Sequence, residues 1–140
     1  FEINYVTPVE LTRYYLTQML KKQSGIIINM CSIASSLAGG GGHAYTSSKH
    51  ALAGFTKQLA LDYAEAGIQI FGIAPGAVKT KMTAADFEPG GLADWVAEET
   101  PIKRWLDPQE VADVTLFLAS GKAAAMQGEI LKIDGGWSLK

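Results

Sequence analysis

Apolar and polar positions along this chain follow two different periods. The runs IIINM and IQIFGIA are short, apolar and rich in branched residues, which is typical of strands buried on both faces of a sheet. Elsewhere apolar residues recur every three or four positions, as at Leu52, Phe55, Leu59 and Tyr63, which is the period of an amphipathic helix. The pattern therefore predicts strands and helices in turn.

Local signals set the expected ends of these elements. Thr7-Pro8-Val9-Glu10 and Asp107-Pro108-Gln109-Glu110 each combine an N-cap residue, proline at the first helical position and glutamate at the third. Gly67 is placed as a helix stop. We expect helices at residues 8–22, 45–65 and 107–118, a short helix near Trp95, and strands at 26–30, 68–74 and 129–133.

This order of elements indicates the fold class. Helices and strands alternate with short connections, and such connections join parallel strands through helices that cover the sheet. The sequence therefore predicts an α/β protein with a parallel sheet.

A glycine-rich loop at residues 39–42 precedes the long helix. Gly39, Gly41 and Ala44 superficially match the dinucleotide fingerprint G-x-G-x-x-G/A. In that fingerprint the first glycine turns directly off the strand, whereas here the strand ends near Met30, nine positions before Gly39. The acidic residue about twenty positions on, Asp62, falls within the helix. We interpret the loop as a pliable connection and not as a phosphate cradle.

Tyr45 and Lys49 stand four positions apart in the predicted helix, so both project from one face. An ammonium beside a phenol stabilises the phenolate, which makes the tyrosine a usable proton donor or acceptor. The ordinary alternative for this common pair is a half-buried aromatic beside a solvated lysine.

Ser32 lies thirteen positions before Tyr45 and just past a strand, at the edge where parallel sheets hold ligands. Ser35 and Ser36 are interpreted as loop residues.

Composition narrows the class of protein. The 140 residues include 12 Lys and Arg against 14 Asp and Glu, a net charge of −2, so we expect no nucleic-acid or anionic membrane partner. One cysteine, Cys31, cannot form an internal disulfide, which suits a cytoplasmic location. No apolar run approaches the roughly 18 residues of a membrane span. Cys31, His43 and His50 lack a regular ligand spacing, so no metal is expected.

Four segments together resemble the short-chain dehydrogenase/reductase family. They are GIIINMCS, YTSSKHALAGFTKQLALDYAEAGIQI, IAPGAVKTKM and GEILKIDGGW, in family order over essentially the whole chain. The resemblance implies a Rossmann-like, doubly wound parallel sheet, an NAD(P) cofactor and a small carbonyl or alcohol substrate. Bacterial 3-oxoacyl-acyl-carrier-protein reductases are the nearest in overall look, and sugars, polyols, steroids and simple ketones are alternative substrates.

The same resemblance implies a role for each matching residue. Tyr45 is the general acid in ketone reduction or the base in alcohol oxidation, and Ser32 hydrogen-bonds the substrate oxygen. Lys49 holds the nicotinamide ribose and assists Tyr45. Asn4 matches the asparagine that supports a water-mediated proton relay, while a helix-start asparagine that caps backbone groups is the local alternative. The implied cofactor contacts are Tyr45, Lys49, Pro75, Gly76, Val78 and Thr80.

In the family, the segment between Met82 and Pro101 closes over the substrate. Phe87, Leu92 and Trp95 are its large apolar residues here, and an apolar loop packed onto the core is the equal alternative. For Thr80 alone, an ordinary turn hydroxyl is the alternative.

Several family features are missing or changed. The Thr-Gly-x-x-x-Gly-x-Gly turn and the Asn-Asn-Ala-Gly stretch would lie before Phe1, so we expect residues 1–140 to be the C-terminal portion of a single domain about a hundred residues longer. The second hypothesis is therefore a non-catalytic oligomerisation or binding fragment. The resemblance also implies a homodimer or homotetramer. Phe71, Cys31 and Gln127 stand where the family often has Asn, Ser and Thr.

Overall fold

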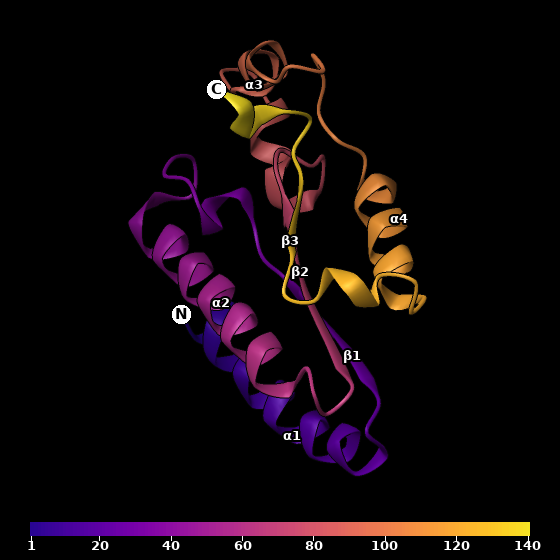
Figure 1. Cartoon of the computed structure of the whole chain (residues 1–140). Coiled ribbons are helices and arrows are strands. Elements are labelled where there is room, and N and C mark those ends of the chain that lie inside the picture. The colour runs from indigo at the N-terminus through magenta and orange to yellow at the C-terminus, as the bar shows by residue number, and fades with distance from the viewer.

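The computed structural model describes residues 1–140 as alternating helices and strands. The main elements in chain order are α1 (Thr7–Lys22), β1 (Gly25–Met30), α2 (Gly42–Tyr63), β2 (Ile68–Pro75), α3 (Ala93–Glu99), α4 (Pro108–Ala119) and β3 (Ile130–Ile133). The strands form one parallel sheet in the order β1-β2-β3, with Gly25 opposite Ile68 and Gly72 opposite Ile130. Helices α1 and α2 cover one face and α4 covers the other (Figure 1). The predicted Rossmann-like α/β fold is confirmed.

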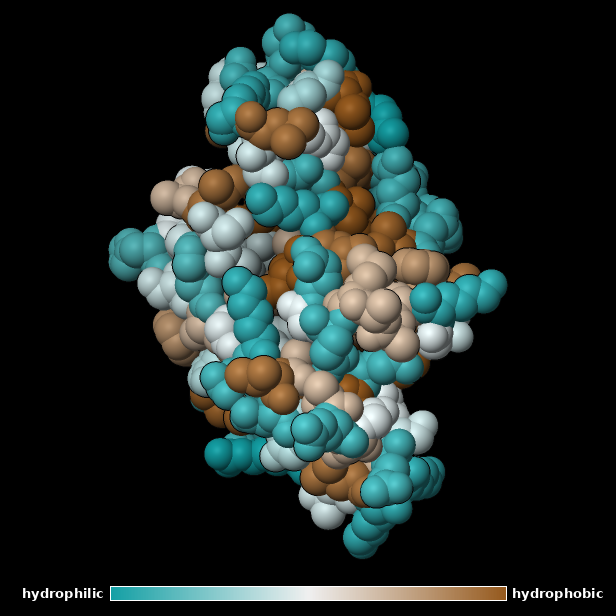
Figure 2. Space-filling view, in the orientation of Figure 1, coloured by the Kyte–Doolittle hydropathy of each residue, from teal (hydrophilic) through white to brown (hydrophobic).

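Strand β2 supplies the core on both faces of the sheet. Ile68 and Ile70 join Leu16 and Leu59 beneath α1 and α2. Phe71 and Ile73 point to the opposite face and join Val111 and Leu118 beneath α4. Phe71 is fully buried there, so its aromatic side chain forms part of this core. Figure 2 shows that hydrophobic residues also gather at the centre of the molecular surface.

The predicted start of α1 is wrong in one respect. Thr7 does not cap the helix, because a π-helical turn, η1 (Glu2–Val6), leads directly into it. The Thr7 hydroxyl instead donates to the carbonyl oxygen of Glu2 at 3.0 Å. Pro8 supplies the physical reason: it has no N–H, and its ring crowds the carbonyl four residues earlier, which belongs to Asn4. The backbone meets this crowding by widening into a π turn.

The other predicted ends are closer to the structure. The Asp107 carboxylate accepts the Gln109 N–H at 2.8 Å, and Glu110 accepts the Asp107 N–H at 2.9 Å, so the predicted capping box of α4 is confirmed. Helix α2 begins three residues before Tyr45 and ends two residues before Glu65. Gly67 follows with a φ of +79°, a conformation that suits glycine at a helix stop.

Gln127 ties three parts of the fold together. Its Nε2 donates to the carbonyl oxygens of Ala60 and Ile68, at 2.9 and 3.0 Å. Its Oε1 accepts the N–H of Ile70 at 3.0 Å. The side chain therefore joins the last turns of α2 and the start of β2 to the segment before β3.

We expect Gln127→Ala to lower the free energy of unfolding by about 1–3 kcal/mol, because it leaves the buried N–H of Ile70 without a partner. Urea unfolding of the protein measures this change. Gln58→Ala is the matched control, because the Gln58 amide bonds only to Asp62 on the exposed face of α2. Equal stability of the two variants would contradict the prediction.

Candidate active site

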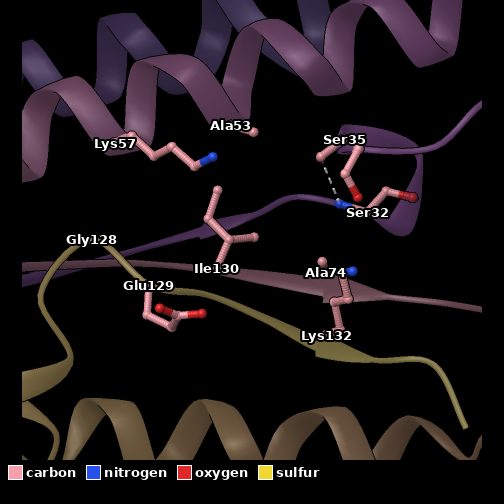
Figure 3. Close-up of a pocket in the computed structure, with 10 residues that line it drawn as sticks. Ser32, Ser35, Ala53, Lys57, Ala74, Gly128, Glu129, Ile130 and Lys132 are labelled. Carbon is pink, nitrogen blue, oxygen red and sulfur yellow. Dashed lines mark hydrogen bonds between the residues drawn. The ribbon is translucent and has the colours of Figure 1, made fainter. Parts of the chain in front are cut away.

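Ser32 stands two residues past the end of β1, at the carboxyl edge of the sheet. Its Oγ accepts the Ala34 N–H at 3.1 Å, and the Oγ of Ser35 accepts the Ser32 N–H at 3.2 Å (Figure 3). This reciprocal pair caps the 3₁₀ helix η2 (Ile33–Ser35) and fixes the side chain. Because the Ser32 hydroxyl accepts within the turn, its own proton remains free to donate to a substrate oxygen.

Ser35 lies in the connection between β1 and α2, as the sequence predicts, but within the short 3₁₀ helix η2 and not in an irregular loop. Its side chain is buried and forms one half of the capping pair that holds Ser32. The signal was present as two serines three positions apart, a weak form of the capping box. Ser36 remains exposed.

Lys49 connects α2 to the end of β1. Its Nζ donates to the carbonyl oxygen of Met30 at 2.7 Å, and the residue is 9% exposed, so the alternative of a solvated lysine is wrong. Burial lowers the pKa of Lys49 from its ordinary value. An ammonium carries three N–H donors, and one of them is used by Met30. Two donors remain for other acceptors at this edge.

Tyr45 lies in the first turn of α2 and is half-buried. The Lys49 Nζ lies 5.7 Å from the centre of its ring, so the two residues share a face as their spacing predicted. The glycine loop makes room for this ring, because a Cβ on Gly41 would lie 2.1 Å from the Tyr45 side chain. Gly42 adds a φ of +72°, a conformation that suits glycine. The loop shape thus serves the placement of Tyr45.

Asn4 reaches the same helix from the π turn. Its Nδ2 donates to the Oγ of Ser48 at 3.2 Å, and that hydroxyl donates to the Tyr45 carbonyl oxygen at 2.7 Å. The Asn4 side chain therefore bonds across to α2 and does not cap α1. Ser48 was not identified from the sequence, because a serine inside a helix gives no sign of its non-local partner.

Val78 and Thr80 follow β2 at the same edge. Leu106 donates to the carbonyl of Ala77 at 2.9 Å and accepts the Lys79 N–H at 3.0 Å. In such a parallel bridge the backbone groups of Val78 itself point away from Leu106.

Thr83 orders this Val78–Thr80 segment. Its hydroxyl donates to the Val78 carbonyl and accepts the Thr80 N–H, both at 2.9 Å. The Val78 N–H has no partner within the chain and is free to donate to a ligand.

Pro75 ends β2, and Gly76 continues the edge towards the C-terminal turn. The Gly76 N–H donates to the Ile133 carbonyl at 2.9 Å, and a Cβ on Gly76 would lie 2.9 Å from the Asp134 backbone. Asp134 in turn accepts the N–H groups of Gly136 and Ser138, at 2.9 and 3.0 Å. Glycine at position 76 is therefore needed for close packing of β2 against β3.

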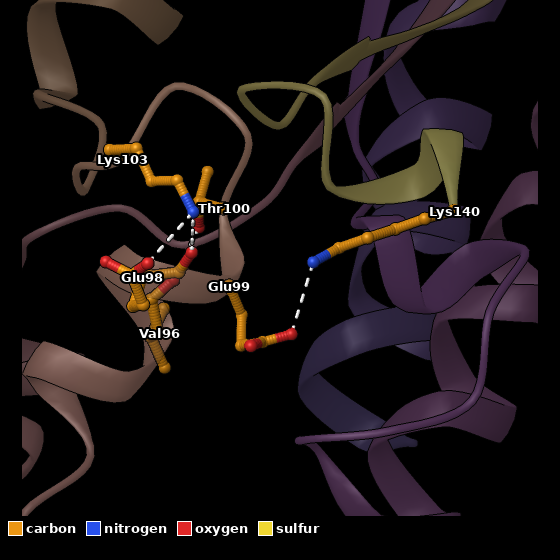
Figure 4. Close-up of polar contacts among 6 residues, drawn as sticks. All are labelled: Val96, Glu98, Glu99, Thr100, Lys103 and Lys140. Atoms are coloured by element: carbon orange, nitrogen blue, oxygen red, sulfur yellow. Dashed lines mark hydrogen bonds and ion pairs between the residues drawn. The ribbon is translucent and has the colours of Figure 1, made fainter.

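The segment between β2 and α4 lies above this edge. The Phe87 ring packs on Trp105 with 4.8 Å between centres, whereas Leu92 and Trp95 are 56% and 55% exposed. An apolar loop packed onto the core does not describe those two residues. Two exposed ion pairs connect helix α3 to its surroundings. Lys103 pairs with Glu98 and Lys140 pairs with Glu99, each at 3.2 Å (Figure 4).

The metal-ligand candidates from the sequence are two histidines and one cysteine. His43 and His50 are exposed, and no group of three or more His, Cys, Asp or Glu side chains is arranged to hold a metal ion. Cys31 is buried behind Ser32, and burial raises the pKa of its thiol. None of the helices combines the length and the apolar character that crossing a bilayer requires.

A family model described as enoyl-(acyl carrier protein) reductase matches residues 1–138. The chain belongs to the short-chain dehydrogenase/reductase family, to which this model refers. The geometry agrees with that assignment, because Lys49 reaches the carbonyl of Met30, two residues before Ser32, and lies beside the ring of Tyr45, while Asn4 bonds to Ser48 in the same turn of α2.

Known relatives act on several substrates. The 5-keto-D-gluconate 5-reductase of Escherichia coli is 36% identical over 141 residues, covering 96% of this chain and 56% of its own length. The 3beta-hydroxysteroid dehydrogenase 2 of Eggerthella lenta is 39% identical over 128 residues, covering 90% of this chain and 48% of its own. The chain thus spans about half the length of the curated relatives it matches.

Among solved structures, a gluconate 5-dehydrogenase from Burkholderia cenocepacia in complex with NADP and tartrate superposes with a TM-score of 0.93. It is 31% identical, and the match covers 98% of this chain and 54% of that protein. The edge that carries Ser32, Tyr45 and Lys49 therefore belongs to a fold in which a relative binds a nicotinamide cofactor together with a hydroxy acid.

Proposed function

We propose that this chain is the proton-transfer half of an NAD(P)-dependent oxidoreductase that interconverts a secondary alcohol and a ketone in a sugar acid. The observation that carries the proposal is the buried Lys49 ammonium. It donates to the carbonyl oxygen of Met30, which stands two residues before Ser32, and it lies beside the ring of Tyr45. A phenol, a fixed positive charge and a free hydroxyl proton are the groups needed to protonate a developing alkoxide.

Each side chain has a distinct task in this scheme. The Tyr45 hydroxyl gives its proton to the ketone oxygen, and the Ser32 hydroxyl donates a hydrogen bond to the same oxygen. The Lys49 charge stabilises the phenolate that remains on Tyr45. In the reverse direction Tyr45 takes the proton of the alcohol. The nicotinamide cofactor, when bound, supplies or accepts the hydride.

The residues present fit the nicotinamide end of such a cofactor. Lys49 has two unused N–H donors for the ribose hydroxyls, since only one of its three is engaged by Met30. The unpartnered N–H of Val78 suits the carboxamide oxygen, and Thr80 stands two residues further along the segment that Thr83 orders. Pro75 and Gly76 stand at the end of β2, and the nicotinamide ring would rest against them.

The relatives shift the proposed substrate class. The sequence favoured a 3-oxoacyl thioester as first choice, with a sugar, polyol or simple ketone among the alternatives. A relative named 5-keto-D-gluconate 5-reductase, and a structural neighbour named as a gluconate 5-dehydrogenase, support the sugar alternative better, and their names narrow it to a sugar acid. A thioester and a steroid remain the competing substrates to be tested.

A direct comparison of substrates tests this proposal. The polypeptide that carries this chain together with the nucleotide-binding half of its relatives is given NADPH and, in turn, 5-keto-D-gluconate, an acetoacetyl thioester and a 3-ketosteroid. We expect kcat/KM to be highest for the keto acid, and its methyl ester is the matched control for recognition of the carboxylate. Preference for the thioester, or no turnover of any ketone, would contradict the proposal.

We further propose that the protein assembles as a homodimer or homotetramer. Leu11, Tyr14 and Tyr15 on α1 are 55%, 65% and 51% exposed, which leaves an apolar face on this helix. This face also supports the second candidate, a non-catalytic oligomerisation fragment. Light scattering that gives the mass of a monomer would contradict assembly, and assembly without any ketone turnover would favour the second candidate.

A further inference from the structure

Ser48 is a fully buried hydroxyl at the contact between the π turn and α2. It has no exposed surface, and both of its hydrogen bonds are made inside the protein, one from Asn4 and one to the Tyr45 carbonyl. Burying a hydroxyl is unfavourable unless its hydrogen bonds are satisfied. A serine at this position therefore has a defined geometry.

The carbonyl that Ser48 contacts belongs to the turn that carries the proposed proton-transfer residues. In an α-helix, the N–H of each residue donates to the carbonyl four positions earlier, so the Lys49 N–H donates to the Tyr45 carbonyl. Ser48 donates its hydroxyl to that same carbonyl at 2.7 Å. Such bonds from a helical serine to the preceding turn alter the local helix geometry. The Ser48 hydroxyl thus acts on the backbone link between Tyr45 and Lys49.

Asn4, the other partner of Ser48, is positioned by the π turn in which it lies. Pro8 has no N–H and crowds the Asn4 carbonyl, and the chain widens into the π turn at residues 2–6. Within the turn the Tyr5 ring packs against Phe55 of α2, with 6.1 Å between ring centres. Asn4 is thereby presented to α2, where its amide meets Ser48 at 3.2 Å.

We propose that Ser48 is a positioning residue, whose hydroxyl joins Asn4 to the Tyr45–Lys49 turn and so fixes the relative placement of the three. This inference rests on the proposed function, because it concerns the placement of the groups that move the proton. Ser48 does not itself meet the substrate. Its effect passes through Asn4 on one side and the Tyr45 carbonyl on the other.

The test is a double-mutant cycle on kcat for ketone reduction, measured in the polypeptide that includes the nucleotide-binding half. We expect Ser48→Ala to lower kcat about ten- to a hundredfold, the size of effect that a small misplacement of reacting groups produces. The KM for the ketone should stay within about threefold, because ground-state binding is untouched. Ser47→Ala, a neighbouring but exposed serine, is the matched control and should behave as wild type.

The cycle separates positioning from a purely structural effect. In an Asn4→Ala background the Asn4 side of the link is already broken, so Ser48→Ala should lower kcat by clearly less than it does in the wild-type background. The pH profile of kcat should shift in Ser48→Ala and stay in place in Ser47→Ala. Additive losses, or an unshifted profile with normal kcat in Ser48→Ala, would overturn the proposal.

One further variant and the wild type keep the test decisive. If Ser48→Ala does not fold, Asn4→Leu replaces it, since it removes the donor to Ser48, keeps a side chain of similar size and adds no titrating group, and it should shift the profile in the same way. An unshifted profile in Asn4→Leu would overturn the proposal. Failure of the wild type to turn over any ketone would instead refute the proposed function, so the two failures are distinguishable.

Discussion

Tyr45→Phe is expected to lower kcat for ketone reduction by about 10²- to 10⁴-fold, the usual contribution of a positioned general acid. The substitution removes one oxygen atom and keeps the ring that packs over Gly41 and beside Lys49. Without the hydroxyl, the general acid assigned to the alkoxide that forms as hydride arrives is lost, and Ser32 offers that oxygen only a hydrogen bond. Steady-state oxidation of NADPH with the preferred ketone measures the loss.

The folding stability of Tyr45→Phe and its binding of NADPH should not fall as kcat does. We expect the melting temperature of Tyr45→Phe to match the wild type, because packing is preserved, and NADPH binding to weaken far less than kcat falls, because Lys49 keeps its donors for the cofactor. Tyr63→Phe is the matched control: it removes the same oxygen from the same helix, at its last residue. Substantial turnover by Tyr45→Phe, or an equal loss in Tyr63→Phe, would contradict the assigned role.

Lys49→Met is expected to lower kcat by about 10²-fold or more and to weaken NADPH binding as well, because it removes the charge that supports the Tyr45 phenolate. Methionine has a similar length and fills the buried space, but it offers no donor to Met30 or to the cofactor ribose. Fluorescence titration with NADPH and steady-state kinetics measure the two losses separately.

Lys22→Met controls for the loss of a positive charge from a helix. Lys22 is the exposed last residue of α1, at the amino end of β1 and away from the carboxyl edge, so its replacement should leave both measurements unchanged. The two residues differ in burial and contacts, not in chemistry. If Lys49→Met had normal NADPH affinity and normal kcat, the role assigned to Lys49 would be contradicted.

The architecture could be predicted because its determinants are local in sequence. Branched apolar runs define β1 and β2, and the Asp107–Glu110 capping box starts α4 where the sequence predicted. The start of α1 was mispredicted because Thr7 and Pro8 carry the same local signs in a cap and in a π turn. What decides between them is the crowding of the Asn4 carbonyl by Pro8, together with packing on α2.

The site was predicted in part for a similar reason. The four-residue spacing of Tyr45 and Lys49 already implies one helix face, and Ser32 follows a recognisable strand. Ser35, Ser48 and Thr83 were missed because each acts by binding backbone or a distant side chain. Ser48 and Asn4 are 44 positions apart in sequence, and only the fold brings them together. Residues that support other residues leave little trace in a single sequence.

Hydride transfer is the central claim, and isotope transfer tests it most directly. NADPH carrying deuterium in place of both hydrogens on the reactive carbon of its nicotinamide ring is incubated with 5-keto-D-gluconate and the polypeptide used for the comparison of substrates, and the product is analysed by mass spectrometry. The account predicts one deuterium on the new carbinol carbon, and none when Tyr45→Phe replaces the wild type over the same time. A reduced product without deuterium, or no product at all, would contradict it.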